Sequence, residues 1–303
     1  MQLFPKKLSQ IYLVLFVSAF LTITGNFTFF QKTILIYPLS ENWLFLGSLF
    51  FFLFTFLAAL LLLFCYRVTT KPILIVLLMI SAIVSYSTNN YGIVFDHNMI
   101  LNTFETDTSE FLDLVSFKSI LYFFIFGLLP SIFVLKVKLI KISFKAQLWE
   151  RIKTFLVLVI IFVIIVLTFS KHYSSFAREN RDLRLYITPT YYLYSATKFV
   201  DSKFATSTKP FKEIGLDAKL NKKSDKRRLV ILVVGETARA DHMSLNGYDR
   251  NTNPYLEKEE IISFDKMTSC GTDTALSVPC MFSLLDRSSY NHAKGKNMSN
   301  VLD

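Results

Sequence analysis

Charged residues are scarce in the first half of this sequence. In the whole chain of 303 residues, charged residues make up 18% and hydrophobic residues 52%. Residues 43–65 carry no charge at all. Few soluble proteins are this apolar. Ionisable residues inside membrane spans mark the pathways of transporters, so their near absence from the apolar runs argues against a transporter.

Cysteine and histidine are scarce as well. The chain has three cysteines and four histidines, and the histidines form no His-x-x-x-His pair. Zinc usually takes four ligands. The histidines therefore predict no complete zinc site by themselves.

Long apolar runs, by contrast, are abundant. A hydrocarbon core about 30 Å thick requires roughly 20 apolar residues in a helix. Five runs reach or approach that length: residues 11–30, 43–65, 72–87, 119–135 and 154–169. The first is longer than the apolar core of about 7–15 residues in a cleaved signal peptide, and further runs follow it. We predict a polytopic α-helical membrane domain with five transmembrane helices in residues 1–170.

Basic residues predict the orientation of these spans, because Lys and Arg mark cytoplasmic loops. They gather before the first run, between the second and third, and between the fourth and fifth: Lys6, Lys7, Arg67, Lys71, Lys136, Lys138, Lys141, Lys145, Arg151 and Lys153. This pattern predicts a cytoplasmic N-terminus and places everything after residue 169 on the opposite side. The net charge of +10 is then mostly a topology signal, and we expect no nucleic-acid partner.

The outer loop between the third and fourth runs, residues 89–116, is long for a compact bundle. Such loops are usually functional or disordered. Regularly occurring apolar residues argue against disorder here. We predict a folded, partly helical segment near the lipid headgroups, with Asn102 and Glu110 in it.

A connector follows in residues 171–227. It begins with aromatic and basic residues, which suit a membrane interface. Pro189 is predicted to break it into helical segments on the outer face. Its last part, "KLNKKSDKRR", is typical of a flexible, solvated linker.

From residue 228 the pattern becomes that of an α/β domain. "LVILVVGE", residues 229–236, is a short apolar run rich in β-branched residues and predicts a buried parallel strand. A polar turn and a helix-like segment come next, as at the start of an α/β domain. Ligands of such domains lie outside the carboxyl ends of the strands, and Glu236 is placed there.

Thr274 lies in the stretch "SCGTDTALSVPC", residues 269–280. A helix starting near Thr274 would point backbone N–H groups toward an anion, and Glu236 could bind a divalent metal. A threonine hydroxyl becomes a nucleophile only when a base, a metal or a helix N-terminus activates it. Thr274 also fits a simpler role as a helix cap. The orientation places Cys270 and Cys280 in an oxidising compartment, where a disulfide persists.

The stretches "VVGETARADHMSLNGYDRNTNP" and "SCGTDTALSVPCMFS" resemble the lipid A phosphoethanolamine transferases. These inner-membrane enzymes of Gram-negative bacteria include the mobile colistin-resistance enzymes and carry an alkaline-phosphatase/sulfatase-like domain. The resemblance covers nearly the whole chain. It implies a transmembrane domain in residues 1–170, an interfacial helical linker in 171–227 and the N-terminal part of a periplasmic catalytic domain in 228–303.

The resemblance also implies roles for individual residues. Glu236 matches a zinc ligand, and Thr274 matches the nucleophile, which binds the same zinc. A disulfide between Cys270 and Cys280 is expected. Thr272 matches a residue near the bound substrate phosphate.

In the outer loop, Asn102 and Glu110 match residues that would contact the lipid headgroup. Solvated loop polarity is the alternative explanation for these two. The implied reaction takes phosphoethanolamine from phosphatidylethanolamine, forms a phosphoethanolamine-threonine intermediate and passes the group to lipid A. Masking the negative charge of lipid A in this way should weaken the binding of polymyxins.

The family's zinc site also needs a later Asp-His pair and further histidines, which this sequence does not contain. We therefore expect a fragment or shortened form with an incomplete α/β domain and little or no transferase activity as written. Two alternatives remain open. One is a non-catalytic membrane protein whose shortened domain serves as a partner surface, and the other is a phosphoglycerol transferase with the same catalytic fold.

Overall fold

The computed structural model describes residues 7–105, 115–204, 211–219, 229–235, 238–264, 266–271, 274–290, 295 and 297–302. The chain divides into two compact units, Met1–Phe204 and Ala205–Asp303.

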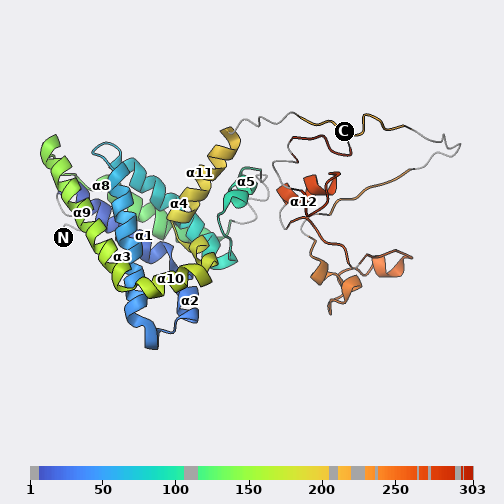
Figure 1. Cartoon of the computed structure of the whole chain (residues 1–303), viewed down its shortest axis with the longest axis horizontal. Helices are drawn as coiled ribbons and strands as arrows, with labels where there is room; N and C mark the ends of the chain where they lie inside the picture. The colour runs from blue at the N-terminus through green and yellow to red at the C-terminus, as the bar shows by residue number, and fades with distance from the viewer. Residues whose placement is uncertain are drawn as a thin grey trace. The chain divides into compact units, whose positions relative to one another are not determined.

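The first unit is a helical bundle (Figure 1). Its helices in chain order are α1 (Gln10–Gly25), α2 (Phe27–Ile36), α3 (Leu39–Phe64), α4 (Thr70–Tyr91), α5 (His97–Glu105), α7 (Phe117–Phe123), the π-helix η1 (Phe124–Leu128), α8 (Leu129–Lys136), α9 (Phe144–Thr168), α10 (Ser170–Glu179), the 3₁₀ helix η2 (Arg181–Tyr186) and α11 (Thr190–Phe204). Within the described residues, four candidate spans are long and apolar enough to cross a membrane: α3, α4, the continuous Phe117–Lys136 and α9. The bent pair α1 and α2 is a fifth candidate, in agreement with the polytopic fold predicted from the sequence.

The first predicted span, residues 11–30, is not one straight helix. The axes of α1 and α2 differ by 58°, and the break falls at Asn26. The Asn26 side chain lies 3.2 Å from the carbonyl oxygens of both Leu21 and Thr22 and donates to them. An asparagine amide that competes for helix carbonyls favours a break in the helix.

Asn26 also joins the bend to the connector. Its Nδ2 donates to the carbonyl oxygen of Thr188 over 2.8 Å, and its Oδ1 accepts from the backbone nitrogen of Thr188 over 2.9 Å. Asn26 is 1% exposed. Since a buried amide must be hydrogen-bonded to be tolerated, this pair of bonds fixes where the connector returns to the bundle.

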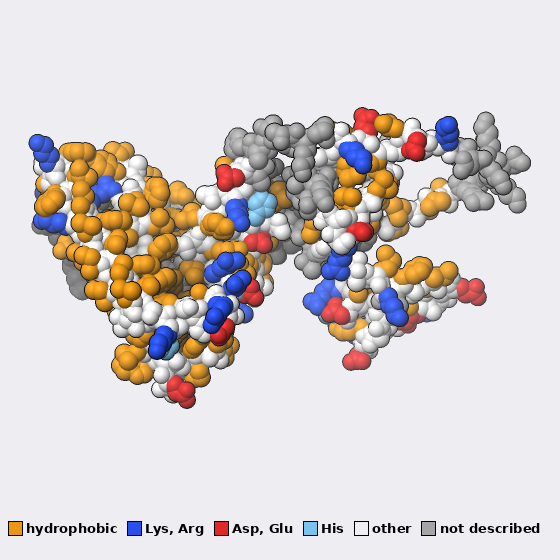
Figure 2. Space-filling view, viewed as in Figure 1, with side chains coloured by type: hydrophobic (Ala, Val, Ile, Leu, Met, Phe, Trp, Pro, Cys, Tyr) orange, Lys and Arg blue, Asp and Glu red, His pale blue; other side chains and the backbone are white. Residues whose placement is uncertain are grey.

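The main core surrounds α1. Its buried side chains pack with those of α3 and α4, and the three helices contribute Leu13, Val14, Val17, Leu21, Leu57, Ala58, Leu61, Leu74, Leu77 and Leu78. In contrast, α9 lies at the margin of the bundle, and only 6% of its most apolar 18-residue window is buried (Figure 1). The first unit shows a broad hydrophobic face with Lys and Arg side chains at its margins, as a membrane-facing surface should (Figure 2).

A second, aromatic core attaches the connector to the bundle. Phe45 of α3 has its ring centroid 5.5 Å from that of Tyr173 and 5.8 Å from that of Phe176, both in α10. The Tyr173 hydroxyl lies 3.0 Å from the Ser48 hydroxyl. The helical segments predicted around Pro189 are α10, η2 and α11, and the aromatic residues Tyr173, Phe176 and Tyr186 pack against the bundle.

The described part of the second unit contains short turns and one helix. These are the 3₁₀ turns η3 (Ala240–His242), η4 (Ser244–Asn246) and η5 (Leu256–Lys258), and α12 (Thr274–Met281). The strand and helix predicted from residue 229 do not form as such: residues 229–235 adopt no strand, and Leu229 is 86% exposed. A strand requires a neighbour for its backbone N–H and C=O groups, and no partner strand is present among the described residues.

We expect Asn26→Ala to lower the free energy of unfolding of the full chain in detergent micelles by about 2–4 kcal/mol. The substitution leaves the buried N–H and C=O of Thr188 without their partners, and each such group costs roughly 1–3 kcal/mol. Chemical unfolding followed by tryptophan fluorescence measures the change. Asn98→Ala, at an exposed position of α5, is the control, and equal stability of the two variants would contradict the assignment.

Candidate active site

The centre of the candidate site is α12 together with the disulfide ring that contains its start. A disulfide joins Cys270 to Cys280, whose Cα atoms are 6.3 Å apart, and this is the pairing that the resemblance implies. Thr274 is the first residue of α12 and is exposed. The predicted helix start at Thr274 is therefore present.

The loop before α12 is held by the hydroxyl of Ser269. This hydroxyl donates to the carbonyl oxygen of Gly271 over 2.7 Å, accepts from the Gly271 nitrogen over 3.3 Å and lies 2.8 Å from the Ser277 hydroxyl. A serine hydroxyl has one donor and two acceptor positions, so all three are used if Ser277 donates. Ser269 thus connects the loop to the first turn of α12.

Gly271 packs closely against α12 in the same ring. A Cβ at this position would overlap Cδ2 of Leu276 and lie 3.0 Å from its Cγ, so the Leu276 side chain would have to shift. The disulfide ties the same loop to the last turn of α12, which contains Cys280.

Of the other predicted site residues, only Asn102 lies within the described part of the chain. Glu236, Thr272 and Glu110 lie outside the described residues. Asn102 lies in α5, in the first unit, and is partly buried. Within the part of the chain that the structure describes, no group of three or more His, Cys, Asp or Glu residues could hold a metal. The structure thus describes Thr274 and its loop but does not bring a ligand set around it.

Helix α5 is placed by its cap and by α11. Asp96 accepts a hydrogen bond from the Met99 nitrogen over 2.8 Å, as a helix cap does. The ring of Phe104 stacks on that of Phe199 with centroids 5.2 Å apart. The partly helical outer loop predicted from the sequence is present in its described portion, and Asn102 is on a packed helix.

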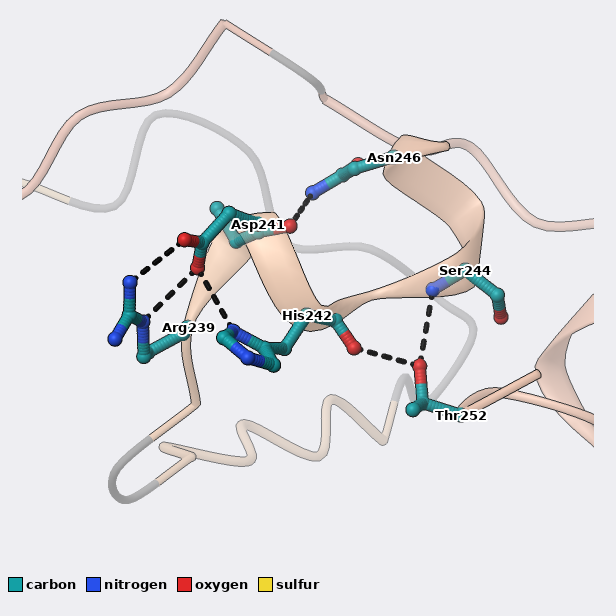
Figure 3. A network of polar contacts seen from close by, with 7 residues as sticks. Arg239, Asp241, His242, Ser244, Asn246 and Thr252 are labelled. Carbon is teal, nitrogen blue, oxygen red and sulfur yellow. Dashed lines mark hydrogen bonds and ion pairs between the residues drawn. The ribbon is translucent and has the colours of Figure 1, made fainter. Parts of the chain in front are cut away.

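Sequence reasoning missed a polar network in the turns after residue 238 (Figure 3). Arg239 contacts both carboxylate oxygens of Asp241, at 3.0 and 2.6 Å, and Nδ1 of His242 lies 3.1 Å from Oδ1 of the same carboxylate. Thr252 donates to the His242 carbonyl oxygen over 2.7 Å and accepts from the Ser244 nitrogen over 3.0 Å. The sequence "RADH", residues 239–242, places a basic residue, an acidic residue and a histidine close together and could have indicated this network.

The network changes the acidity of Asp241. The hydrogen bonds from Arg239 and then from His242 lower the pKa of Asp241 from 3.8 to about 2. The same ion pair raises the pKa of Arg239. Both side chains of the pair are well exposed, so the pair organises the turn more than it stabilises the unit.

Two family models match the chain. One, described as phosphoethanolamine transferase EptA/EptB, matches residues 53–204, and the other, described as sulfatase, matches residues 228–303. The chain thus has the parts of a polytopic membrane protein with a sulfatase-like segment. It belongs to the EptA/EptB phosphoethanolamine transferase family.

Individual relatives give the same result. The chain is 40% identical over 306 residues to phosphatidylethanolamine transferase Mcr-1 of Escherichia coli, covering 99% of this chain and 57% of that protein. It is 38% identical to Mcr-2 of the same species, covering 95% and 54%. The solved structure of the integral membrane protein lipooligosaccharide phosphoethanolamine transferase A (EptA) from Neisseria meningitidis matches with a TM-score of 0.89 and 30% identity, over 99% of this chain and 56% of that one. The chain spans about half the length of these relatives.

We expect the Asp241 carboxyl to titrate near pH 2. Because its pKa is lowered on folding, the network contributes stability above the ordinary pKa of 3.8 and loses it as the pH falls toward 2. Carbon-detected NMR of protein with ¹³C-labelled aspartate measures this, with the resonance assigned by its loss in Asp241→Asn.

Arg239→Gln should return the pKa of Asp241 toward its ordinary value. Arg250→Gln removes an exposed arginine of the same segment and should leave the pKa unchanged. A titration that responds equally to both substitutions would show that general charge, rather than the ion pair, sets the acidity.

Proposed function

We propose that the protein carrying these residues transfers phosphoethanolamine from phosphatidylethanolamine to lipid A. The observation that supports this most is the match to transferases over nearly the whole chain, including the loop in which Thr274 begins α12 within the Cys270–Cys280 ring. The transfer modifies lipopolysaccharide and reduces its negative charge. Lower affinity for polymyxins follows from that change.

Thr274 is the proposed nucleophile. Its Oγ1 forms a bond to the phosphorus of phosphatidylethanolamine, the bond from phosphorus to the diacylglycerol oxygen breaks, and diacylglycerol leaves with the threonine proton. An oxygen of a lipid A phosphate then bonds to the same phosphorus. The Oγ1–P bond breaks, and Thr274 regains a proton from the acceptor.

The start of α12 suits this role. The first N–H groups of a helix have no partners within the helix and attract anions. A phosphodiester in front of Thr274 would meet these N–H groups as negative charge develops on its oxygens, and such preorganised donors lower the barrier. Thr272, in the same loop, is proposed to lie near the phosphate.

Zinc is the proposed cofactor, inferred from the family resemblance. Glu236 and Thr274 are its proposed ligands. The described residues supply only the Thr274 hydroxyl, which does not make up the four ligands that zinc usually takes.

The proposed location is the bacterial inner membrane, with the N-terminus in the cytoplasm and the second unit in the periplasm. Its support is the distribution of Lys and Arg between the helices that could cross the membrane. Phosphatidylethanolamine and lipid A in the outer leaflet are then within reach of the second unit. Asn102 and Glu110 are proposed to contact the lipid headgroup from the outer loop.

We expect Thr274→Ala, introduced into the full protein, to abolish transfer, with a loss of roughly 10³-fold or more, because no other hydroxyl replaces the nucleophile. Mass spectrometry of lipid A from cells that express each variant measures the added phosphoethanolamine. Thr268→Ala is the matched control, since it removes an exposed threonine of the same segment. Full transfer by Thr274→Ala would overturn the assignment.

We expect Asn102→Ala to raise KM for phosphatidylethanolamine by roughly 3–10-fold with little change in kcat. Loss of one hydrogen bond to a headgroup has this size, and a contact made equally in the ground and transition states affects KM alone. Asn98→Ala on the same helix is the control. A fall in kcat with unchanged KM would argue against a headgroup contact.

A further inference from the structure

A cavity of about 770 Å³ opens at the end of the membrane bundle opposite to the connector's attachment. Three segments far apart in sequence line it. They are the residues around the start of α1, the turn from α3 into α4, and the segment that joins α8 to α9. All of them belong to the first unit.

Among the described residues that line the cavity, six are cationic and none is acidic. Its basic residues are Lys7, Arg67, Lys71, Lys136, Lys138 and Lys141. None of them forms an ion pair within the described residues of the chain. Like charges that line one cavity repel one another, and an anion bound among them would offset that repulsion.

The floor of the cavity is built and polar. Gln147 of α9 donates to Oε1 of Gln10, and Nε2 of Gln10 donates to the carbonyl oxygen of Cys65 over 2.8 Å and to the Thr70 hydroxyl over 2.6 Å. Both glutamines are buried. These bonds fasten the three segments to one another and fix the floor of the cavity.

The wall formed by the α8–α9 segment is fastened as well. The Leu8 nitrogen donates to the Lys138 carbonyl oxygen, and the Ile140 nitrogen donates to the Leu8 carbonyl oxygen, each over 3.0 Å. Lys71 donates to the Leu135 carbonyl oxygen over 2.6 Å. Lys138 and Lys141 thus project from a backbone that is held in place at its base.

Exposed apolar side chains share the lining with the cations. Val68 is 81% exposed, Ile140 is 45% exposed and Ile142 is 41% exposed. A free inorganic anion would leave these side chains uncovered. A molecule with an anionic headgroup and acyl chains would satisfy the cations and cover the apolar residues together.

We propose that this cavity binds the phosphate headgroup of an acidic phospholipid from the cytoplasmic leaflet, with the acyl chains over Val68, Ile140 and Ile142. The choice of leaflet rests on the proposed orientation. Basic pockets between transmembrane helices on the cytoplasmic side are suited to anionic headgroups. Basic residues in cytoplasmic loops are sufficient to set the orientation of the spans. That role does not require the side chains of three separate loops to line one cavity.

The test titrates the purified full chain, stripped of lipid in detergent, with phosphatidylglycerol and follows bound lipid by native mass spectrometry. The double variant Lys138→Gln/Lys141→Gln should bind roughly 20–30-fold more weakly than the wild type. Lys145→Gln/Lys153→Gln removes the same charge from α9, outside the cavity, and should bind as the wild type does. Phosphatidylethanolamine should bind the wild type much more weakly than phosphatidylglycerol.

Equal weakening in the two double variants would overturn the proposal, because it would show a general effect of charge. Displacement of the lipid by inorganic phosphate at matching concentration would also overturn it and would assign the cavity to a free anion. If the cavity variant fails to fold, the preference of the wild type for phosphatidylglycerol over phosphatidylethanolamine still tests the proposal. Equal binding of phosphatidylethanolamine and phosphatidylglycerol would then contradict the proposal.

Discussion

The first unit depends on one amide pairing, in which the Asn26 side chain binds both the N–H and the C=O of Thr188. These residues are 162 positions apart in sequence. The pairing occurs at the bend between α1 and α2, where Asn26 also occupies carbonyls of α1. Gly25 beside it carries no side chain, and a Cβ there would lie 3.3 Å from the Thr188 methyl group. The connector can therefore lie directly against the bend.

The position of α11 follows from this attachment, because α11 begins two residues after Thr188. The hydroxyl of Tyr192 lies 3.1 Å from that of Ser81 in α4, which ties the helix to the bundle. Phe199 of α11 then stacks on Phe104 of α5. The Asn26–Thr188 pairing thus fixes where α11 begins. Through the Phe199–Phe104 contact, α11 in turn holds α5, the helix that contains Asn102.

Sequence reasoning predicted the spans because apolar length largely decides what can cross a bilayer, and it predicted a helix that starts near Thr274. It missed the break at Asn26, since the partner that makes a buried asparagine favourable there is 162 residues away. It predicted a strand at residues 229–235 from composition, yet a strand forms only against a neighbour. The Cys270–Cys280 loop of the candidate site was predicted from the sequence. The Arg239–Asp241–His242 network was not, because it depends on turn geometry that composition does not reveal.

Helix α9 contributes many exposed apolar side chains and few buried ones; Leu158 and Gln147 are its buried residues. Lipid tails are as apolar as leucine, so a lipid-facing position requires an apolar side chain but no particular shape. Natural variation on that face is constrained by hydropathy alone, and exchanges among Ile, Val, Leu and Phe there are close to neutral. Sequence drift within the family should therefore accumulate along α9, while α1, enclosed by α3 and α4, retains the size of each side chain.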